Sequence, residues 1–473
     1  MTGPELEATA KVLRLLAACT PGTELQNARE QGLGTVEKLI REISQKRKRT
    51  MKAEREKHDQ EIVDATGIRR QKSLRALQVM GETSDELVRK EEPSPERIVE
   101  KHIRCYICKI KYEEVHHFYD KLCPACADFN WKKRHQTADL TDMVCLVTGG
   151  RIKIGYEIAL KLLRARAAKV IVTSRFPNDT VLRFAREPDF SVWGTRLHVY
   201  GLDFRFLKQV EKFGEFLASS LERLDVVINN ACQTIRRPPI FYAHLLAIES
   251  TPLPLALASL VGGEEAKSEK ASVVVMRDEG KSSAASSQLC LVPEDEPGFY
   301  PPETFPQNQY DKDGQQLDLR STNSWVLGIQ DVSLEEMCEV QAVNTIAPFI
   351  LTKRLLPLLY KKPADRNAHI INVSSMEGQF SRFKTAHHPH TNASKAGLNM
   401  FTRTCAREFA LQRVWMNAVD TGWISDENPV GTLRKEFHLP LDEIDGAARV
   451  LDPVFTSPCT FGLFLKDYRP VAW

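Results

Sequence analysis

The sequence lacks a long hydrophobic run and an excess of charge of one sign. Its most apolar stretch, residues 241–261, is interrupted by His244, Glu249 and two prolines, so we expect no membrane-spanning helix. The 65 basic and 62 acidic side chains nearly cancel, which excludes a whole-chain attraction to nucleic acid or anionic membranes. Glu5 and Glu7 precede the first apolar run, unlike the basic start of a targeting leader. We therefore expect a cytoplasmic protein, with the nucleus as the alternative.

Cysteine is also too sparse for a disulfide scaffold, with 11 in 473 residues. Four of them nevertheless form two Cys-x-x-Cys pairs, Cys105 with Cys108 and Cys123 with Cys126. Each pair turns two sulfurs toward one point, and two pairs complete a tetrahedral thiolate site. The sequence therefore predicts a zinc module over residues 100–135. Because four sulfurs leave no open coordination position, we expect this zinc to be structural.

Two histidines, His116 and His117, lie between the pairs. Either could replace one sulfur, but a packing or solvent-facing role is the favoured interpretation. A RING-type ubiquitin ligase needs a second, interleaved set of four ligands. His102 and His135 do not supply the cysteines that usually build such a set, so this class ranks low.

The region before the module, residues 1–95, is predicted to be helical and rich in charge. Residues 6–18 and 34–46 have apolar positions spaced by three and four, which predicts short amphipathic helices. The basic run Lys46–Arg49 is compatible with an import signal or with phosphate contacts. A solvated helix face is the favoured interpretation. Pro93 and Pro95 then indicate a linker.

From residue 140 to residue 473 the pattern changes to continuous apolar runs that alternate with helix-like segments. Such runs are typical of strands buried on both faces of a parallel sheet. We therefore predict an α/β, Rossmann-like, doubly wound parallel sheet. One polar stretch, about 233–335, breaks the rhythm and is expected to be a partly disordered insertion. The predicted strands lie within residues 143–150, 169–175, 196–204, 224–231, 368–375 and 415–422.

The most informative segment is the one that joins the first two of these elements. A predicted strand ends at Thr148, Gly149, Gly150 and Gly155 follow, and an amphipathic helix begins. Glycine allows the backbone to approach a diphosphate closely, and the helix start offers free N–H groups and a positive dipole end. The segment therefore predicts a dinucleotide site.

This segment and those that follow it resemble the short-chain dehydrogenase/reductase family over roughly residues 142–473. The family's opening Thr-Gly-x-x-x-Gly-x-Gly falls on Thr148, Gly149 and Gly155. Lys153 stands where the middle glycine is usual, which puts the tightness of the turn in question. Lys153 or Arg151 could meet a phosphate by charge instead.

The resemblance implies further cofactor contacts. Arg175 follows the second predicted strand, where a base implies NADP and an acid implies NAD. NAD stays open, because a capping or exposed arginine explains the same residue. Asp203 matches the family's adenine-contacting aspartate, and Asn230 with Ala231 matches its strand-end motif. Gly422 falls in the segment that lies near the nicotinamide.

The resemblance also implies catalytic residues. Asn344, Ser375 and Lys395 match the family's asparagine, serine and lysine, and that lysine also binds the ribose. Thr391 stands in the place of the proton-transferring tyrosine. A threonine hydroxyl stays protonated at physiological pH and cannot replace a phenol. An imidazole has an unperturbed pKa near 6.5, and His390 is the nearest candidate acid/base, although a structural or substrate-binding role is the favoured interpretation.

Two function classes follow. The first is an NADP-dependent oxidoreductase that acts on an unidentified carbonyl or alcohol. The alternative is a weakly active or inactive dinucleotide-binding scaffold, whose zinc module and basic helical arm bind a protein or RNA partner. The preserved serine, asparagine and lysine favour the enzyme. Family members commonly pair through two long helices, so a homodimer or a tetramer is the default, which the insertion and the N-terminal module could block.

Overall fold

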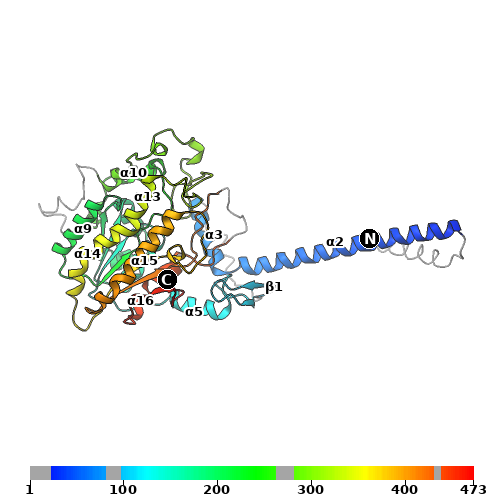
Figure 1. Ribbon diagram of the computed structural model, residues 1–473, viewed down its shortest axis with the longest axis horizontal. Coiled ribbons are helices and arrows are strands. Elements are labelled where there is room, and N and C mark those ends of the chain that lie inside the picture. Colours follow the sequence, from blue (N-terminus) through cyan, green and yellow to red (C-terminus); the bar gives the residue numbers. More distant parts are fainter. Residues whose placement is uncertain (1–22, 81–96, 263–281, 431–437) are drawn as a thin grey trace.

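The computed structural model describes residues 23–80, 97–262, 282–430 and 438–473. The helix predicted for residues 6–18, the linker around Pro93 and Pro95, and the polar stretch 263–281 of the insertion lie outside these residues. The described chain consists of a large α/β domain, a small cysteine-containing module beside it and a long projecting helix (Figure 1).

The α/β domain is built on one sheet with the strand order β10-β9-β8-β7-β6-β3-β4-β5. All neighbours pair in parallel except β9 and β10. The strand order reverses between β3 and β6, which confirms the predicted doubly wound fold and marks the place where ligands bind in such sheets. The strands are β3 (Val144–Thr148), β4 (Lys169–Ser174), β5 (Leu197–Gly201), β6 (Val226–Asn229), β7 (Ala368–Ser374), β8 (Val414–Asp420), β9 (Phe464–Lys466) and β10 (Arg469–Val471).

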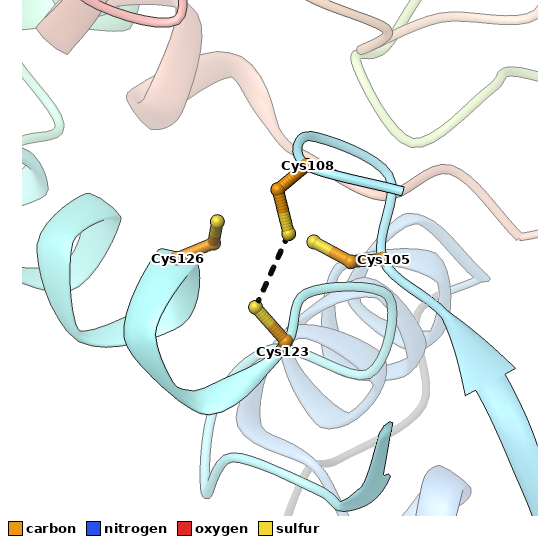
Figure 2. Close-up of side chains that lie close together, drawn as sticks. All are labelled: Cys105, Cys108, Cys123 and Cys126. Atoms are coloured by element: carbon orange, nitrogen blue, oxygen red, sulfur yellow. Dashed lines mark hydrogen bonds between the residues drawn. The ribbon is translucent and has the colours of Figure 1, made fainter. Parts of the chain in front are cut away.

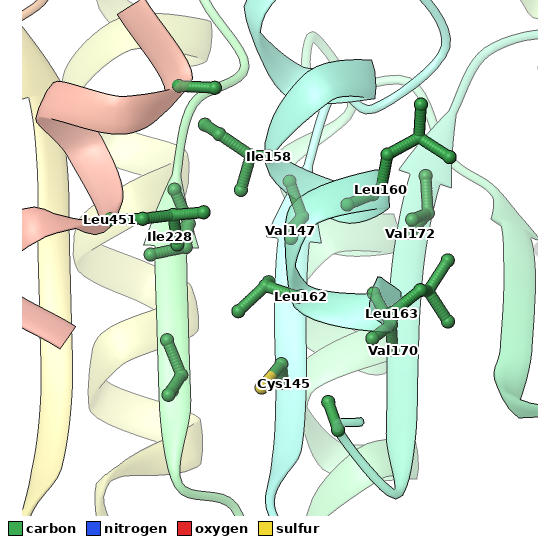
Figure 3. Packing of buried hydrophobic residues seen from close by; sticks show 14 of the residues in the cluster. Cys145, Val147, Ile158, Leu160, Leu162, Leu163, Val170, Val172, Ile228 and Leu451 are labelled. Atoms are coloured by element: carbon green, nitrogen blue, oxygen red, sulfur yellow. The ribbon is translucent and has the colours of Figure 1, made fainter. Parts of the chain in front are cut away.

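Helices cover both faces of this sheet (Figure 1). On one face, α6 and α16 bury Ile158, Leu162 and Leu451 against β3, β4 and β6, as Figure 3 shows. On the other face, α9, α14 and α15 pack on the opposite sides of the same strands. Burial on both faces explains the continuous apolar runs. The covering helices are α6 (Lys153–Arg164), α7 (Pro177–Phe184), α8 (Phe190–Trp193), α9 (Leu207–Ser220), α14 (Ala347–Tyr360), α15 (Pro389–Ala410) and α16 (Glu443–Thr456).

The insertion between β6 and α14 contains short helices and no strand of the sheet among its described residues. Phe241, Tyr242, Leu245 and Phe305 pack with Phe176, which follows β4, in an apolar cluster. The described part of the insertion is therefore folded onto the carboxyl edge of the sheet. Its helices are η2 (Pro239–Tyr242), α10 (Ala243–Ser250), α11 (Leu255–Ala258), α12 (Ser283–Ser286), η5 (Pro293–Asp295), η6 (Pro302–Thr304) and α13 (Leu334–Gln341).

The N-terminal region differs from the prediction of short helices. One helix, α2 (Thr23–Asp64), spans 42 residues and projects away from the body (Figure 1). The chain has no proline in this range, and the pairs Lys52 with Glu56 and Lys57 with Glu61 support it at i,i+4 spacing. Lys46–Arg49 are exposed on it. Helix α3 (Gly67–Met80) returns to the body.

The cysteine-containing module is formed by the hairpin β1 (Ile98–Arg104) and β2 (Lys111–Glu114) and by helix α5 (Pro124–Arg134). It is fixed to the α/β domain by buried polar contacts. Arg134 donates to the carboxylate of Asp442 at 2.6 and 2.8 Å, and Tyr119 donates to Asp445 at 2.6 Å. Both aspartates lie at the start of α16, so the module and the sheet form one body.

One helical stretch of the described chain, Leu334–Tyr360, could cross a membrane by its length and composition. However, 56% of its apolar window is buried inside the protein. Leu351, Leu355, Leu358 and Leu359 of this stretch belong to the core on one face of the sheet. This is typical of the core helix of a folded domain.

Candidate functional site

The turn between β3 and α6 has the geometry that its glycines predict. Gly149 has a φ of +68°, a conformation that glycine adopts without strain. A Cβ on Gly155 would lie 2.2 Å from the Gly149 carbonyl oxygen, so only glycine lets the helix start so close to the strand. Asn230 donates to the carbonyl oxygens of Thr148 and Gly149 at 3.0 and 3.1 Å. The turn thus directs the free N–H groups of α6 to the sheet edge that suits a diphosphate.

Lys153 has a left-handed backbone conformation, although it is not a glycine. Its φ is +54°, which costs a residue other than glycine about 1–2 kcal/mol. Desolvation lowers the pKa of Lys153, but the carboxylates of Glu427, Asp313 and Asp311 raise it above its usual value. The turn therefore stays tight without the middle glycine, and a charged ammonium group stands at the start of α6.

The other cation of this turn, Arg151, is buried. Its guanidinium donates to Asp179 on α7 and to Gln315 of the insertion, both at 2.8 Å. Arg151 therefore ties the insertion to the α/β domain. Of the two cations proposed from the sequence for a phosphate, this placement favours Lys153.

The strand-end motif after β6 supports the same turn. The backbone N–H groups of Asn230 and Ala231 both donate to the Thr148 hydroxyl at 3.0 Å. A Cβ on Gly149 would lie 2.9 Å from the Ala231 Cα. Asn230 and Ala231 thus lie beside the glycine turn and fix its shape.

Arg175 follows β4 and is half-buried. Its Nη2 donates to the Tyr242 hydroxyl at 2.8 Å, and its guanidinium carbon lies 4.4 Å from the centre of the Tyr242 ring. Burial alone would raise the pKa of Tyr242, but Arg175, Arg237 and Arg151 lower it. No carboxylate of the described residues pairs with Arg175. A cation with a neutral partner, close to two further guanidinium groups, suits an anionic ligand.

Asp203, at the end of β5, is buried and pairs with Arg205 at 2.8 Å. Arg205 also donates to Glu339 and to the Ser286 carbonyl oxygen of α12. The insertion reaches Arg175 as well, since the Ser283 hydroxyl donates to its carbonyl oxygen at 2.8 Å. The insertion therefore borders the sheet edge where an adenosine would lie.

Asn344 lies in a π-helical turn, Ala342–Ile346, between α13 and α14. Its Nδ2 donates to the Ser394 hydroxyl and to the Gln233 carbonyl oxygen, both at 3.1 Å. Its Oδ1 accepts the Gln233 N–H at 2.8 Å. Single π-helical turns often mark functional sites. Here the turn orients the Asn344 amide so that its hydrogen bonds connect Ser394 on α15 with Gln233 after β6.

Lys395, Ser375 and Thr391 lie around the carboxyl end of β7. Lys395 is buried on α15, and its Nζ donates to the Val373 carbonyl oxygen at 2.9 Å, two residues before Ser375. Thr391, one helical turn earlier, is 1% exposed. Its hydroxyl has no hydrogen-bond partner among the described residues. The site therefore contains a lysine and hydroxyl groups, but no phenol at position 391.

Two histidines precede Thr391 at the start of α15. His390 is 2% exposed, and its Nε2 lies 3.4 Å from a carboxylate oxygen of Glu336 on α13. Burial alone would raise the pKa of Glu336, but His390 and Ser324 lower it by hydrogen bonding. His388 stacks on Trp325 of the insertion, with ring centres 4.0 Å apart. Both imidazoles thus connect α15 to its neighbours.

Gly422 follows β8 with a φ of +84°, and a Cβ there would lie 2.5 Å from Leu441. The next N–H, that of Trp423, donates to the hydroxyl of Tyr106 at 3.0 Å. Tyr106 belongs to the cysteine module and Tyr242 to the insertion, and neither stands in a motif of the α/β domain. No spacing rule connects such distant segments.

The four cysteines come together as predicted (Figure 2). Their sulfurs all lie within 4.8 Å of one another, and those of Cys108 and Cys123 are 3.6 Å apart. Tetrahedral zinc, with bonds of about 2.3 Å to each sulfur, separates its ligands by roughly 3.8 Å, so the cluster fits this ion. Burial raises the pKa of the Cys108 thiol, but hydrogen bonds from Ile110 and the other cysteines lower it to about 7. His116 and His117 are not part of this cluster.

Comparison with known proteins agrees with this architecture. The short chain dehydrogenase family matches residues 143–244 and 321–434, which leaves the middle of the insertion unmatched. The chain belongs to the short-chain dehydrogenase family. An uncharacterized protein of Acanthamoeba polyphaga mimivirus is 31% identical over 379 residues, which cover 77% of this chain and 74% of that protein. Residues before the α/β domain are therefore included in that similarity.

Other relatives match shorter parts. Glucose 1-dehydrogenase 2 of Bacillus subtilis is 30% identical over 124 residues, which are 25% of this chain and 46% of that protein. Among solved structures, the NADPH-bound carbonyl reductase from chicken fatty liver is 18% identical. The matched region covers 71% of this chain and 100% of the reductase chain, with a TM-score of 0.43.

Proposed function

We propose that the chain is an NADP-dependent oxidoreductase that acts on a carbonyl or alcohol. The observation that carries the proposal is the intact turn between β3 and α6 on the same sheet edge as Lys395. The turn retains its left-handed backbone at Gly149 and Lys153, and the lysine ammonium is held at the end of β7. A dinucleotide on this edge would extend from the turn to Lys395.

The preference for NADP rests on Arg175. The guanidinium of Arg175 donates to the neutral Tyr242 hydroxyl and has no anionic partner among the described residues, so the 2′-phosphate of the adenosine ribose would supply one. Lys153 provides a cation for the diphosphate. Asp203 follows β5 at the same edge of the sheet, where it would contact the adenine. NAD is the alternative cofactor.

A bound nicotinamide would supply or accept the hydride. In the direction of carbonyl reduction, the Ser375 hydroxyl would donate a hydrogen bond to the substrate oxygen. Lys395 would hold the ribose and supply the proton that this oxygen gains, and water would then return a proton to the lysine. Thr391 cannot supply this proton because its hydroxyl does not ionise near neutral pH. His390 contacts Glu336 at 3.4 Å, so we assign it the positioning of α15, with proton transfer as the alternative.

The four cysteines are proposed to hold structural zinc. All four available positions of a tetrahedral ion are filled by sulfur, so the metal stabilises the module and does not bind substrate.

A homodimer is proposed through the outer faces of α14 and α15. Phe349 on α14 and Met400 on α15 are 49% and 54% exposed, and Ile346, directly before α14, is 40% exposed. The ring centres of Phe349 and Phe401 lie 5.3 Å apart between the two helices. Covering a contiguous apolar face of this kind favours association.

A scaffold that binds dinucleotide without turnover is the second candidate. Two observations favour it: threonine at position 391, and the exposed basic residues Lys46–Arg49 on the projecting α2, which suit an RNA or acidic protein partner. Titration with NADPH and a screen of carbonyls and alcohols separate the candidates. The enzyme requires turnover that is lost in Lys395→Met, whereas the scaffold binds NADPH without turnover. If neither NADPH nor NADH binds, both candidates fail.

A further inference from the structure

The cysteine module and the α/β domain share one apolar core. Cys105 and Cys123, at 1% and 2% exposure, are buried in the same cluster as Ile424 and Leu441 of the α/β domain, and Ile154 packs against it. Groups in one close-packed cluster cannot shift independently. The position of the cysteine ligands is therefore coupled to the position of these isoleucines.

These isoleucines belong to the two backbone segments that border the dinucleotide site. Ile154 lies directly before Gly155, in the first turn of α6, at the diphosphate end. Ile424 lies two residues after Gly422, beyond the carboxyl end of β8. In a doubly wound sheet the cofactor crosses from the first strand to the strands on the other side of the switch point, so β6, β7 and β8 carry its nicotinamide half.

Tyr106 makes the direct polar contact between the two parts. It stands between the first two cysteines, and its own N–H donates to the Lys121 carbonyl oxygen at 2.8 Å. Its hydroxyl accepts the N–H of Trp423 at 3.0 Å. A Cβ on Gly422 would be 3.8 Å from the same hydroxyl oxygen. The loop that carries Cys105 and Cys108 thus fixes the backbone of residues 422–424, which follow β8.

The module is held firmly enough to transmit this constraint. Arg449 on α16 donates to Asn130 of α5 at 2.7 Å. Arg134 bridges Asp442 and Asp445 at 2.6 and 3.0 Å, and all three of these side chains are buried. Removal of one partner from such buried pairs lowers the stability of a fold strongly. The contact between α5 and α16 therefore holds Tyr106 at a fixed position relative to the end of β8.

We propose that the zinc-loaded cysteine module forms a wall of the cofactor site and that Tyr106 is a positioning residue for the segment 422–424. This inference rests on the proposed function. It gives the fused module a role: zinc and dinucleotide stabilise the same arrangement of the chain, so each binds more tightly when the other is present.

The test compares Tyr106→Phe with Tyr112→Phe. Tyr112 is a matched control because its hydroxyl donates to the Asp120 carbonyl oxygen inside the module. Calorimetry on the zinc-loaded full chain uses two ligands, NADPH and 2′,5′-ADP, which lacks the nicotinamide half. Metal analysis and melting temperature establish that each variant is folded and zinc-loaded. If Tyr106→Phe does not retain zinc, the chelator experiment on the unmodified chain decides.

In Tyr106→Phe we expect the dissociation constant of NADPH to rise about two- to tenfold, which is the effect of one net hydrogen bond. The dissociation constant of 2′,5′-ADP should not change. Tyr112→Phe should bind both ligands normally. The inference is overturned if Tyr106→Phe weakens both ligands equally or neither. If the unmodified chain binds neither ligand, the proposed function itself fails, so the two failures are distinguishable.

A second measurement uses the unmodified chain. Zinc loss to a competing chelator is followed with a colour indicator, with and without saturating NADPH. Reciprocal coupling predicts that NADPH raises the chelator concentration needed for half-release, and that 2′,5′-ADP does so less. Identical release curves with and without NADPH would contradict the coupling.

Discussion

The choice between NADP and NAD can be tested at Arg175. In Arg175→Met the chain keeps a side chain of similar length but loses the guanidinium that donates to Tyr242 at 2.8 Å. A hydrogen bond to a charged group contributes about 1.5–3 kcal/mol, or roughly 10- to 150-fold in affinity. Because Arg175 is half-buried, part of its charge is screened, and we expect the lower end of this range for NADP.

The assay is calorimetric titration of NADP and NAD at low and high ionic strength. The NADP dissociation constant should rise roughly tenfold in the variant, whereas that of NAD, which has no 2′-phosphate, should stay within about twofold. Added salt should reduce the difference, because the interaction is partly screened. Arg164→Met serves as the control, since Arg164 lies on the outer side of α6 and pairs with Asp189 and Glu187.

Tyr242→Phe extends the experiment, because the phenol orients the guanidinium. Its effect on NADP should be smaller and should largely disappear in the double variant with Arg175→Met. Equal weakening of NADP and NAD by Arg175→Met would contradict a role for Arg175 at the 2′-phosphate. It would mean that Arg175 supports the fold of this edge and does not read a phosphate.

Three further outcomes are expected. Lys395→Met should remove turnover and weaken NADPH binding, since it loses both the proton path and the ribose contact; unchanged turnover in steady-state assays would contradict this role. Gly155→Ala should destabilise the fold by about 1–3 kcal/mol and abolish dinucleotide binding, because the new Cβ would be 2.2 Å from a carbonyl oxygen; denaturant unfolding and calorimetry measure both. Burial lowers the pKa of His369 to about 4. Above the unfolded pKa of about 6.5 the imidazole is neutral in both states and does not change the stability. As the pH falls toward 4, only the unfolded chain takes up the proton, so the fold loses stability. This amounts to about 3 kcal/mol, which His369→Gln should remove from the pH dependence of unfolding.

The sheet could be predicted because its strands are buried on both faces. All six predicted strands are present, since parallel strands of this kind consist of apolar runs that are visible without an alignment. The short β9 and β10 (Phe464–Lys466 and Arg469–Val471) were missed, because three residues are too few to show a pattern. The long α2 was predicted only as short helices, since its polar surface hides the period.

The candidate site was predictable where close backbone contacts require glycine or where cysteines share a metal. Gly149, Gly155 and the four cysteines are of this kind. The sequence could not show that Lys153 has a left-handed backbone, because residues other than glycine rarely adopt one. It also could not show Tyr106 and Tyr242, because the folding of the module and of the insertion, not local spacing, brings these phenols to the sheet edge.

The central claim is that the β3–α6 turn and Lys395 together bind a pyridine dinucleotide. Calorimetric titration of the full, zinc-loaded chain with NADPH tests it most directly. The account predicts saturable one-to-one binding that is weakened in Lys395→Met and abolished in Gly155→Ala. An absence of heat with both NADPH and NADH, for a chain shown to be folded and zinc-loaded, would contradict it.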